Sequence, residues 1–347
     1  MKNIIFKIKI GIFSLAILSL AACSSTALTN YFTPIVDVQI PPHDPKLVLI
    51  GRIVSGVDSI ELFITKSRGA LDTALLNSNL TSQNGNRGNS AFDTVNNATV
   101  KVFKDGVLIA TPKYYQNGVY LAKLTSKIAE DKATYTVQVS AAGFTSIEAT
   151  QKMVGAPAKI DTVITTQNVK VSKPLDLNNP FDPFGDPYNA TQFTFYFKDV
   201  PNENNYYTAF GVAQLPNDPN LRGLRAESRD PVSENNYLDA RNLDAKSIAW
   251  STHTRRIGGG RGGGPNGGGP GGPGGGPSNN SQVPAGTVVT LTLSSVSYDR
   301  FLFEQSYATY QAALNNPFSE PVILHSNIKN GFGVFTTASE RTFTVKF

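Results

Sequence analysis

The stretch TVKVFKDGVLI at residues 99–109 decides the fold class. Val100 and Val102 alternate with polar residues, and a second apolar run begins at Val107. Asp105-Gly106 lies between the two runs, and Asp-Gly is the preferred centre of a type I′ turn because both central positions need positive φ. The stretch therefore predicts a β-hairpin.

The segments around this hairpin also have the pattern of short strands. Apolar residues alternate with other residues between positions 47 and 64, as in strands with one buried face. Further strands are expected at 118–124 and 131–139. The second of these resembles the tyrosine corner of immunoglobulin-like sandwiches, with Tyr135 tying its strand to the preceding loop. Six or seven short strands predict an immunoglobulin-like or prealbumin-like β-sandwich over residues 46–155.

A second β-rich domain is expected over residues 156–347. Its core strands are predicted where aromatic and β-branched residues gather. These runs lie at residues 159–164, 192–197, 206–212, 288–293 and 342–345. The chain as a whole is therefore predicted to be mainly β, with two domains.

One segment of the second domain, residues 298–314, predicts an α-helix. Phe303, Tyr307, Tyr310 and Leu314 fall on one helical face, and Phe301 and Leu302 flank it. Ser297 can cap the start, and Asn315-Asn316-Pro317 ends the pattern. We expect this aromatic face to pack on the second sheet.

The first 22 residues have the pattern of a signal peptide: the first nine hold three lysines and no acid, and residues 10–20 are apolar. As a helix, that run is about 16 Å long, far short of the roughly 30 Å hydrocarbon core of a bilayer. The run ends in Leu20-Ala21-Ala22-Cys23, which resembles the bacterial lipobox. We therefore expect cleavage before Cys23, lipidation of its sulfur by acyl chains such as palmitate, and a tether over residues 23–45.

Charge and cysteine content exclude several classes of protein. Loss of residues 1–22 removes three of the 31 basic residues and leaves 28 against 26 acidic ones, a net charge of +2. This balance gives no basic surface of the kind that nucleic acids require. Cys23 is the only cysteine, so the lipidated chain would have no disulfide and no thiolate nucleophile.

A low-complexity insertion lies within the second domain. Residues 258–277 contain fourteen Gly and four Pro. Such a segment cannot bury apolar surface, so a flexible loop is expected.

The sequence offers few candidates for catalytic chemistry. H-E-x-x-H, G-x-S-x-G and P-loop patterns are all missing from it. No catalytic residue and no cofactor are therefore expected. The best candidates for a metal site are Asp182 and Asp186 in an Asp/Pro-rich stretch, because carboxylates suit calcium. An ordinary turn region explains the same residues, and no metal is expected.

A short repeat provides the best candidates for ligand contact. Glu203-Asn204-Asn205-Tyr206 recurs as Glu234-Asn235-Asn236-Tyr237. One interpretation is a polar turn that leads into a strand. The other is that Tyr206, Tyr207 and Tyr237 are exposed and stack on a carbohydrate or peptide.

Several stretches resemble the Bacteroidota lipoprotein family DUF4249. They are residues 45–51, Gly118-Val119-Tyr120 with Tyr135, and above all the motif from Asn316 to Val322 and from Ser326 to Phe335. The resemblance implies an outer-membrane lipoprotein of β-rich two-domain build, often encoded beside a TonB-dependent transporter. It implies no catalytic residues.

These features give an ordered set of functional hypotheses. The first is a non-enzymatic accessory or binding lipoprotein beside a TonB-dependent transporter. The second is a structural or envelope-assembly lipoprotein without a nutrient ligand, and the third is a hydrolytic enzyme with a dispersed site. Ser24 differs from the Asp that commonly retains lipoproteins in the inner membrane, so the outer membrane is expected. The periplasmic and cell-surface faces both stay open.

Substitution Cys23→Ala should leave the protein without lipid and release it from membranes, because no other segment is predicted to hold it there. Metabolic labelling with a clickable fatty acid, followed by membrane fractionation, measures both effects. Label that persists on the variant would contradict the assignment.

Overall fold

The structure of the protein is a computed structural model. It describes residues 43–68, 93–171, 188–216, 221–226, 236–243, 246–254, 283–314 and 320–347. Cys23, Asp182, Asp186 and the Gly/Pro-rich segment 258–277 lie outside these ranges.

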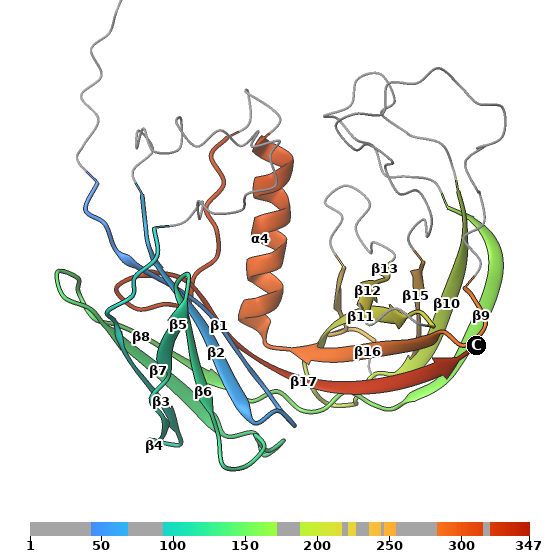
Figure 1. Ribbon diagram of the computed structural model, residues 1–347, viewed down its shortest axis with the longest axis horizontal. Coiled ribbons are helices and arrows are strands. Elements are labelled where there is room, and N and C mark those ends of the chain that lie inside the picture. Colours follow the sequence, from blue (N-terminus) through green and yellow to red (C-terminus); the bar gives the residue numbers. More distant parts are fainter. Residues whose placement is uncertain are drawn as a thin grey trace, which may run out of the picture. The chain divides into compact units, whose positions relative to one another are not determined.

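The described chain is mainly β with one α-helix, as the sequence predicts (Figure 1). The elements are β1 (Leu47–Val54), β2 (Ser59–Lys66), β3 (Thr99–Lys104), β4 (Val107–Ala110), β5 (Lys113–Gln116), β6 (Val119–Lys123), β7 (Thr134–Ser140), β8 (Ile147–Lys152), β9 (Ile160–Val171), β10 (Tyr188–Lys198), β11 (Tyr206–Gln214), β12 (Leu221–Gly223), β13 (Arg225–Ala226), β14 (Tyr237–Asp239), β15 (Ser247–His253), β16 (Val288–Val296), α4 (Tyr298–Leu314) and β17 (Phe332–Lys346).

These strands form three sheets, and the largest is shared by two hydrophobic cores. Its nine strands follow the order β12-β11-β16-β17-β1-β2-β6-β5, with β14 paired to β11. The sheet β4-β3-β7-β8 supplies residues such as Val137 to the first core, together with Leu49 and Leu62 of the large sheet. The sheet β13-β15-β10-β9 supplies Trp250 to the second core, together with Leu291 of the large sheet. At each of the two cores, the large sheet and one smaller sheet therefore form a sandwich-like arrangement.

Local features of the first sandwich follow from its sequence. Asp105 and Gly106 have φ of 47° and 82°, as the predicted type I′ hairpin between β3 and β4 requires. The tyrosine that ties a strand to a preceding loop is Tyr120, not Tyr135. Its hydroxyl accepts a 2.9 Å hydrogen bond from Ala98 N and donates one of 2.9 Å to Val95 O. Tyr135 is buried in the core instead.

Strand β17 joins the two cores. It pairs in parallel with β1, where Gly51 lies opposite Phe335, and antiparallel with β16. Phe335 belongs to the first core, and Val345 packs against the second. The sequence places a domain boundary between residues 155 and 156, but β17 lies on both sides of that division in space. The sequence predicts only residues 342–345 of β17 to be in a strand, because residues 336–342 are mostly polar and lack the apolar pattern of a strand.

The helix has the predicted bounds but does not pack as predicted. Its buried contacts come from Phe301 and Leu302, which meet Val296 and Ala338 of the large sheet. From there α4 rises away from β16 (Figure 1). The aromatic face that was expected to be core is partly exposed. Phe303, Tyr307 and Tyr310 stack in a row, with ring centroids 6.2 and 6.4 Å apart. The prediction of a buried stripe is wrong because only the start of the helix reaches the sheet.

Close backbone approach explains a glycine in the C-terminal motif. Gly333 has a φ of 104°, and a Cβ on it would lie 2.1 Å from the carbonyl oxygen of Leu49. The parallel pairing of β1 and β17, in which Leu49 lies opposite Gly333, therefore requires glycine at this position.

Substitution Gly333→Ala should lower the free energy of unfolding by about 3 kcal/mol, because it combines positive φ with a backbone clash. Gly56→Ala is the matched control. Gly56 also has positive φ (79°) but has nothing within 4 Å of its Cβ position. The control should cost about 1 kcal/mol. Urea unfolding of both variants measures the difference, and equal losses would show that the close approach to Leu49 is unimportant.

Candidate functional site

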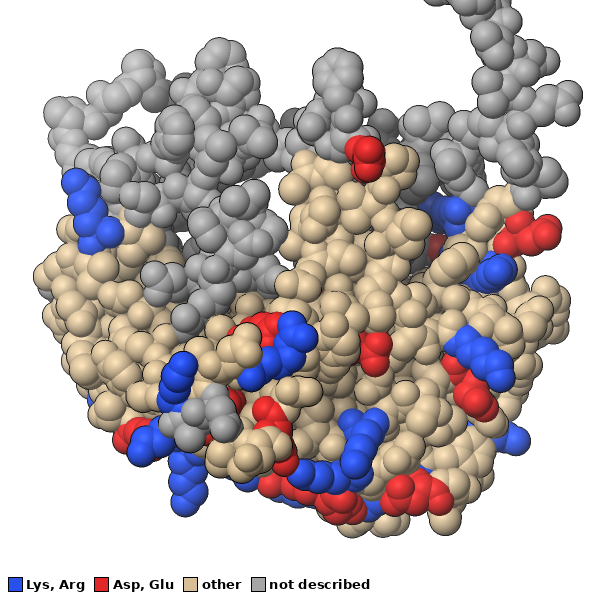
Figure 2. All heavy atoms as spheres, turned by 180° about the vertical axis from the view of Figure 1, so that it is seen from behind, with Lys and Arg blue, Asp and Glu red and all other residues tan. Residues whose placement is uncertain are grey.

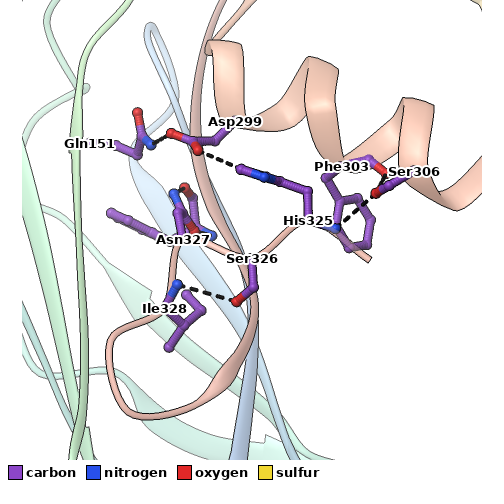
Figure 3. Close-up of polar contacts among 9 residues, drawn as sticks. Gln151, Asp299, Phe303, Ser306, His325, Ser326, Asn327 and Ile328 are labelled. Carbon is purple, nitrogen blue, oxygen red and sulfur yellow. Dashed lines mark hydrogen bonds and ion pairs between the residues drawn. The ribbon is translucent and has the colours of Figure 1, made fainter. Parts of the chain in front are cut away.

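The candidate site lies where α4 meets the segment that returns from the helix to β17. The start of the helix is fixed to the sheet, because Ser297 N donates to Thr337 O at 3.1 Å. Residues 320–328 lie outside any helix or strand, and part of this segment lines one side of α4. Figure 3 shows the polar contacts that hold the segment in place.

Asn327 replaces a missing strand neighbour of β17. Val296 is the last residue of β16 to pair with β17, opposite Ala338, because the chain then turns into α4. The backbone of Phe335 therefore has no strand on that side. Asn327 Nδ2 donates to Phe335 O at 2.7 Å, and Phe335 N donates to Asn327 Oδ1 at 2.9 Å. One side chain thus satisfies both backbone groups, as buried polar groups require.

His325 fastens the returning segment to the helix. Its Nε2 lies 2.6 Å from Asp299 Oδ1, and Gln151 of β8 donates to the other oxygen of the same carboxylate. The backbone N of His325 donates to Ser306 Oγ at 2.9 Å. Ser306 in turn donates to Phe303 O at 2.8 Å. The contacts shown in Figure 3 thus join β8, α4 and the segment.

This cluster has a carboxylate–histidine pair, but its hydroxyl is poorly placed for nucleophilic chemistry. A nucleophile needs a base within hydrogen-bond reach of its own proton. The proton of Ser306 is directed to the carbonyl of Phe303, and its oxygen already accepts from the backbone of His325. The arrangement positions the segment rather than a reacting atom.

A groove of about 720 Å³ lies beside this cluster. Gln305 and Thr309 of α4 form part of one wall, and Ile323 and Leu324 form part of the other. The full lining is Leu302, Gln305, Ser306, Thr309, Ile323, Leu324, His325, Ser326, Ile328, Gly331 and Phe332. This lining contains no Asp, Glu, Lys or Arg, and the volume is in the range of ligand pockets.

Apolar side chains on the groove are unusually open to solvent. Ile323 is 90 % exposed, Phe332 45 % and Leu324 37 %. Lys46 Nζ lies 5.5 Å from the centroid of the Phe332 ring, so one cation borders the groove. Exposed apolar surface gathered around a groove is typical of a binding site.

The tyrosines proposed as ligand contacts do not form an exposed site. Tyr207 is fully buried and its hydroxyl donates to Asp199 Oδ1 at 2.9 Å. Burial raises the pKa of Tyr207. Tyr206 is 6 % exposed and packs against Tyr298 and Phe301 at 5.0 and 4.9 Å between ring centroids. The interpretation in which these two rings are exposed is wrong, because both belong to the packed interior.

Tyr237 is half-buried, and burial raises its pKa. Its hydroxyl accepts a 3.2 Å hydrogen bond from Arg300 Nε at the start of α4. Tyr206 and Tyr237, the last residues of the two copies of the repeat, begin neighbouring antiparallel strands, with Thr208 opposite Tyr237. Asn205 Nδ2 donates to Val200 O at 2.8 Å within its own turn. These contacts fit the alternative interpretation of a polar turn before a strand.

Charges of both signs are mixed on the described surface, and several of them form ion pairs. Lys and Arg are interspersed with Asp and Glu on the face drawn in Figure 2. Arg341 contacts both carboxylate oxygens of Glu130 at 2.6 and 2.8 Å, and this contact holds the pKa of Glu130 below its usual value. Within the described ranges, no group of three or more His, Cys, Asp and Glu is placed to hold a metal ion. No helix among them is long and apolar enough to cross a membrane.

Comparison with known protein families shows which family the chain belongs to. The sequence matches the family described as a domain of unknown function, DUF4249, over residues 33–344. The chain belongs to this family. It has no significant match among curated proteins.

The sequence pointed to the C-terminal motif but not to the roles of its side chains. A Cβ on Gly331 would lie 2.6 Å from the carbonyl oxygen of Leu47, so close backbone approach accounts for this glycine as well as for Gly333. The roles of Asn327 and His325 were missed, because no local pattern shows that β16 leaves β17 before Phe335.

Substitution Asn327→Ala should lower the free energy of unfolding by about 2 kcal/mol, because it leaves a donor and an acceptor of Phe335 unpaired. Asn189→Ala, at an exposed position of β10, serves as the control and should change stability by less than about 0.5 kcal/mol. Chemical unfolding measures both values. Equal stability of the two variants would refute the assigned role of Asn327.

Proposed function

We propose that this protein is a non-enzymatic, lipid-anchored binding or accessory protein of the outer membrane that works beside a TonB-dependent transporter. The observation that carries the proposal is the uncharged groove between α4 and residues 323–332, with exposed Ile323, Leu324 and Phe332 on it. Such a surface suits the binding of another molecule without a chemical step. The lipobox at Cys23 and the resemblance to transporter-associated lipoproteins support the location and the partner.

Tethering strengthens the physical case for an accessory role. A lipid-anchored protein is confined near its membrane, so its effective concentration at a membrane-embedded partner is high. A modest interface then suffices, and an interface of that kind needs a limited exposed apolar surface rather than a large one. The groove provides a surface of this type.

Chemical cross-linking in the native host, followed by pull-down of a tagged copy, should recover a TonB-dependent receptor above the level seen with an unrelated outer-membrane lipoprotein. The reason is the high local concentration that the anchor provides. Equal recovery with both baits would reject the partnership and favour an envelope-assembly role. Protease treatment of intact cells tells the surface face from the periplasmic face, because only a surface-exposed tag is removed.

A further inference from the structure

Two residues of the returning segment that line the groove, Ile323 and Leu324, have backbone groups without a partner among the described residues. Within the described part of the chain, no hydrogen bond is found for the backbone N–H or C=O of Val322, Ile323 or Leu324. The backbone N of His325, by contrast, is bound to Ser306 Oγ. Unpaired backbone donors and acceptors are matched by water or by the backbone of another chain.

The wall of the groove that α4 forms, opposite the returning segment, favours a neutral ligand. Asp299, Arg300 and Glu304 lie in the first two turns of α4, and each contacts another side chain. From Gln305 to Ala313 the helix has no charged residue, while Gln305 and Thr309 offer amide and hydroxyl groups. A charge placed against this wall would lose water without gaining a counter-charge from the helix, and the cation that borders the groove, Lys46, lies at the Phe332 ring. An uncharged polar or apolar peptide chain does not have this cost of removing a charge from water.

Other surfaces are less suited to a peptide. The strand edges of β4 and β5 expose Val107 and Tyr115, but both pair with their neighbours through register shifts, which disfavour further strand addition. A second hollow of about 410 Å³ on β3, β7 and β8 is lined by Lys101, Glu148 and other polar residues. The backbones of Glu148 and Lys329 there are already paired with each other.

We propose that the groove between α4 and residues 323–326 binds an extended, uncharged peptide segment of a partner protein. The segment hydrogen-bonds to the free backbone of Ile323 and Leu324 and places apolar side chains against Ile323, Leu324 and Phe332. Gln305 and Thr309 contact it from the helix. The inference rests on the proposed accessory function, because the partner of an accessory protein supplies the peptide.

Site-specific photo-cross-linking in the native host tests the proposal. A benzophenone amino acid at Thr309, which lines the groove, is compared with one at Gln311, an exposed helix position outside it. Cross-linking at 309 should exceed that at 311, and mass spectrometry should map the product to an uncharged stretch of a partner protein. The isosteric change Gln305→Glu should reduce the yield at 309 at least about tenfold, and Gln311→Glu should not.

No excess at 309, a product that is lipid or glycan, or equal yields with Gln305→Glu and Gln311→Glu would overturn the proposal. These outcomes are separate from those that test the proposed function. Equal recovery of a receptor with the wild type and with Gln305→Glu would support the accessory role and reject peptide binding in the groove. A mapped peptide from a protein that is not a TonB-dependent receptor would support the groove and reject the transporter as the partner.

Discussion

The parallel pairing of β17 with β1 is the constraint on which the rest of the fold depends. Residues 334–339 of β17 are buried, so neither face of this part of the strand is open to water. Its hydroxyl groups are therefore bonded internally. Thr337 Oγ1 donates to Lys152 O at 2.7 Å, and Ser339 Oγ donates to Val154 O at 2.9 Å. The large sheet remains continuous between the two cores because β17 crosses from one to the other.

The groove is a geometric consequence of that strand. β17 extends beyond the pairing with β16, since β16 ends at Val296 and the chain rises into α4. The segment that returns from the helix must then reach the start of β17 along the side of α4. Asn327 closes the open side of β17, and His325 holds the segment to Asp299. The space left between helix and segment is the groove.

Sequence patterns predicted the elements whose signals are local. The Asp105-Gly106 hairpin and the bounds of α4 could be obtained from turn chemistry, capping and periodicity. Periodicity did not show which face of the helix is buried. Phe301 and Phe303 lie on different faces, so both faces carry apolar residues. Tyr206 and Tyr207 show the same limit. A tyrosine after a polar turn has the same local signal whether its ring is exposed or packed in the core.

The residues of the candidate site were only partly predictable, because their roles depend on contacts distant in sequence. Gln151 and Asp299 are far from His325 in the chain, and only the folded sheet brings them together. The C-terminal motif was nevertheless visible in the sequence. Side chains in the segment that contains it differ in whether they face the scaffold or the solvent. Asn327 is bonded to the scaffold, whereas Ile323 is 90 % exposed. Structural and binding roles are thus compatible within one segment, since rigid attachment on one side fixes the open side in a single position for a partner.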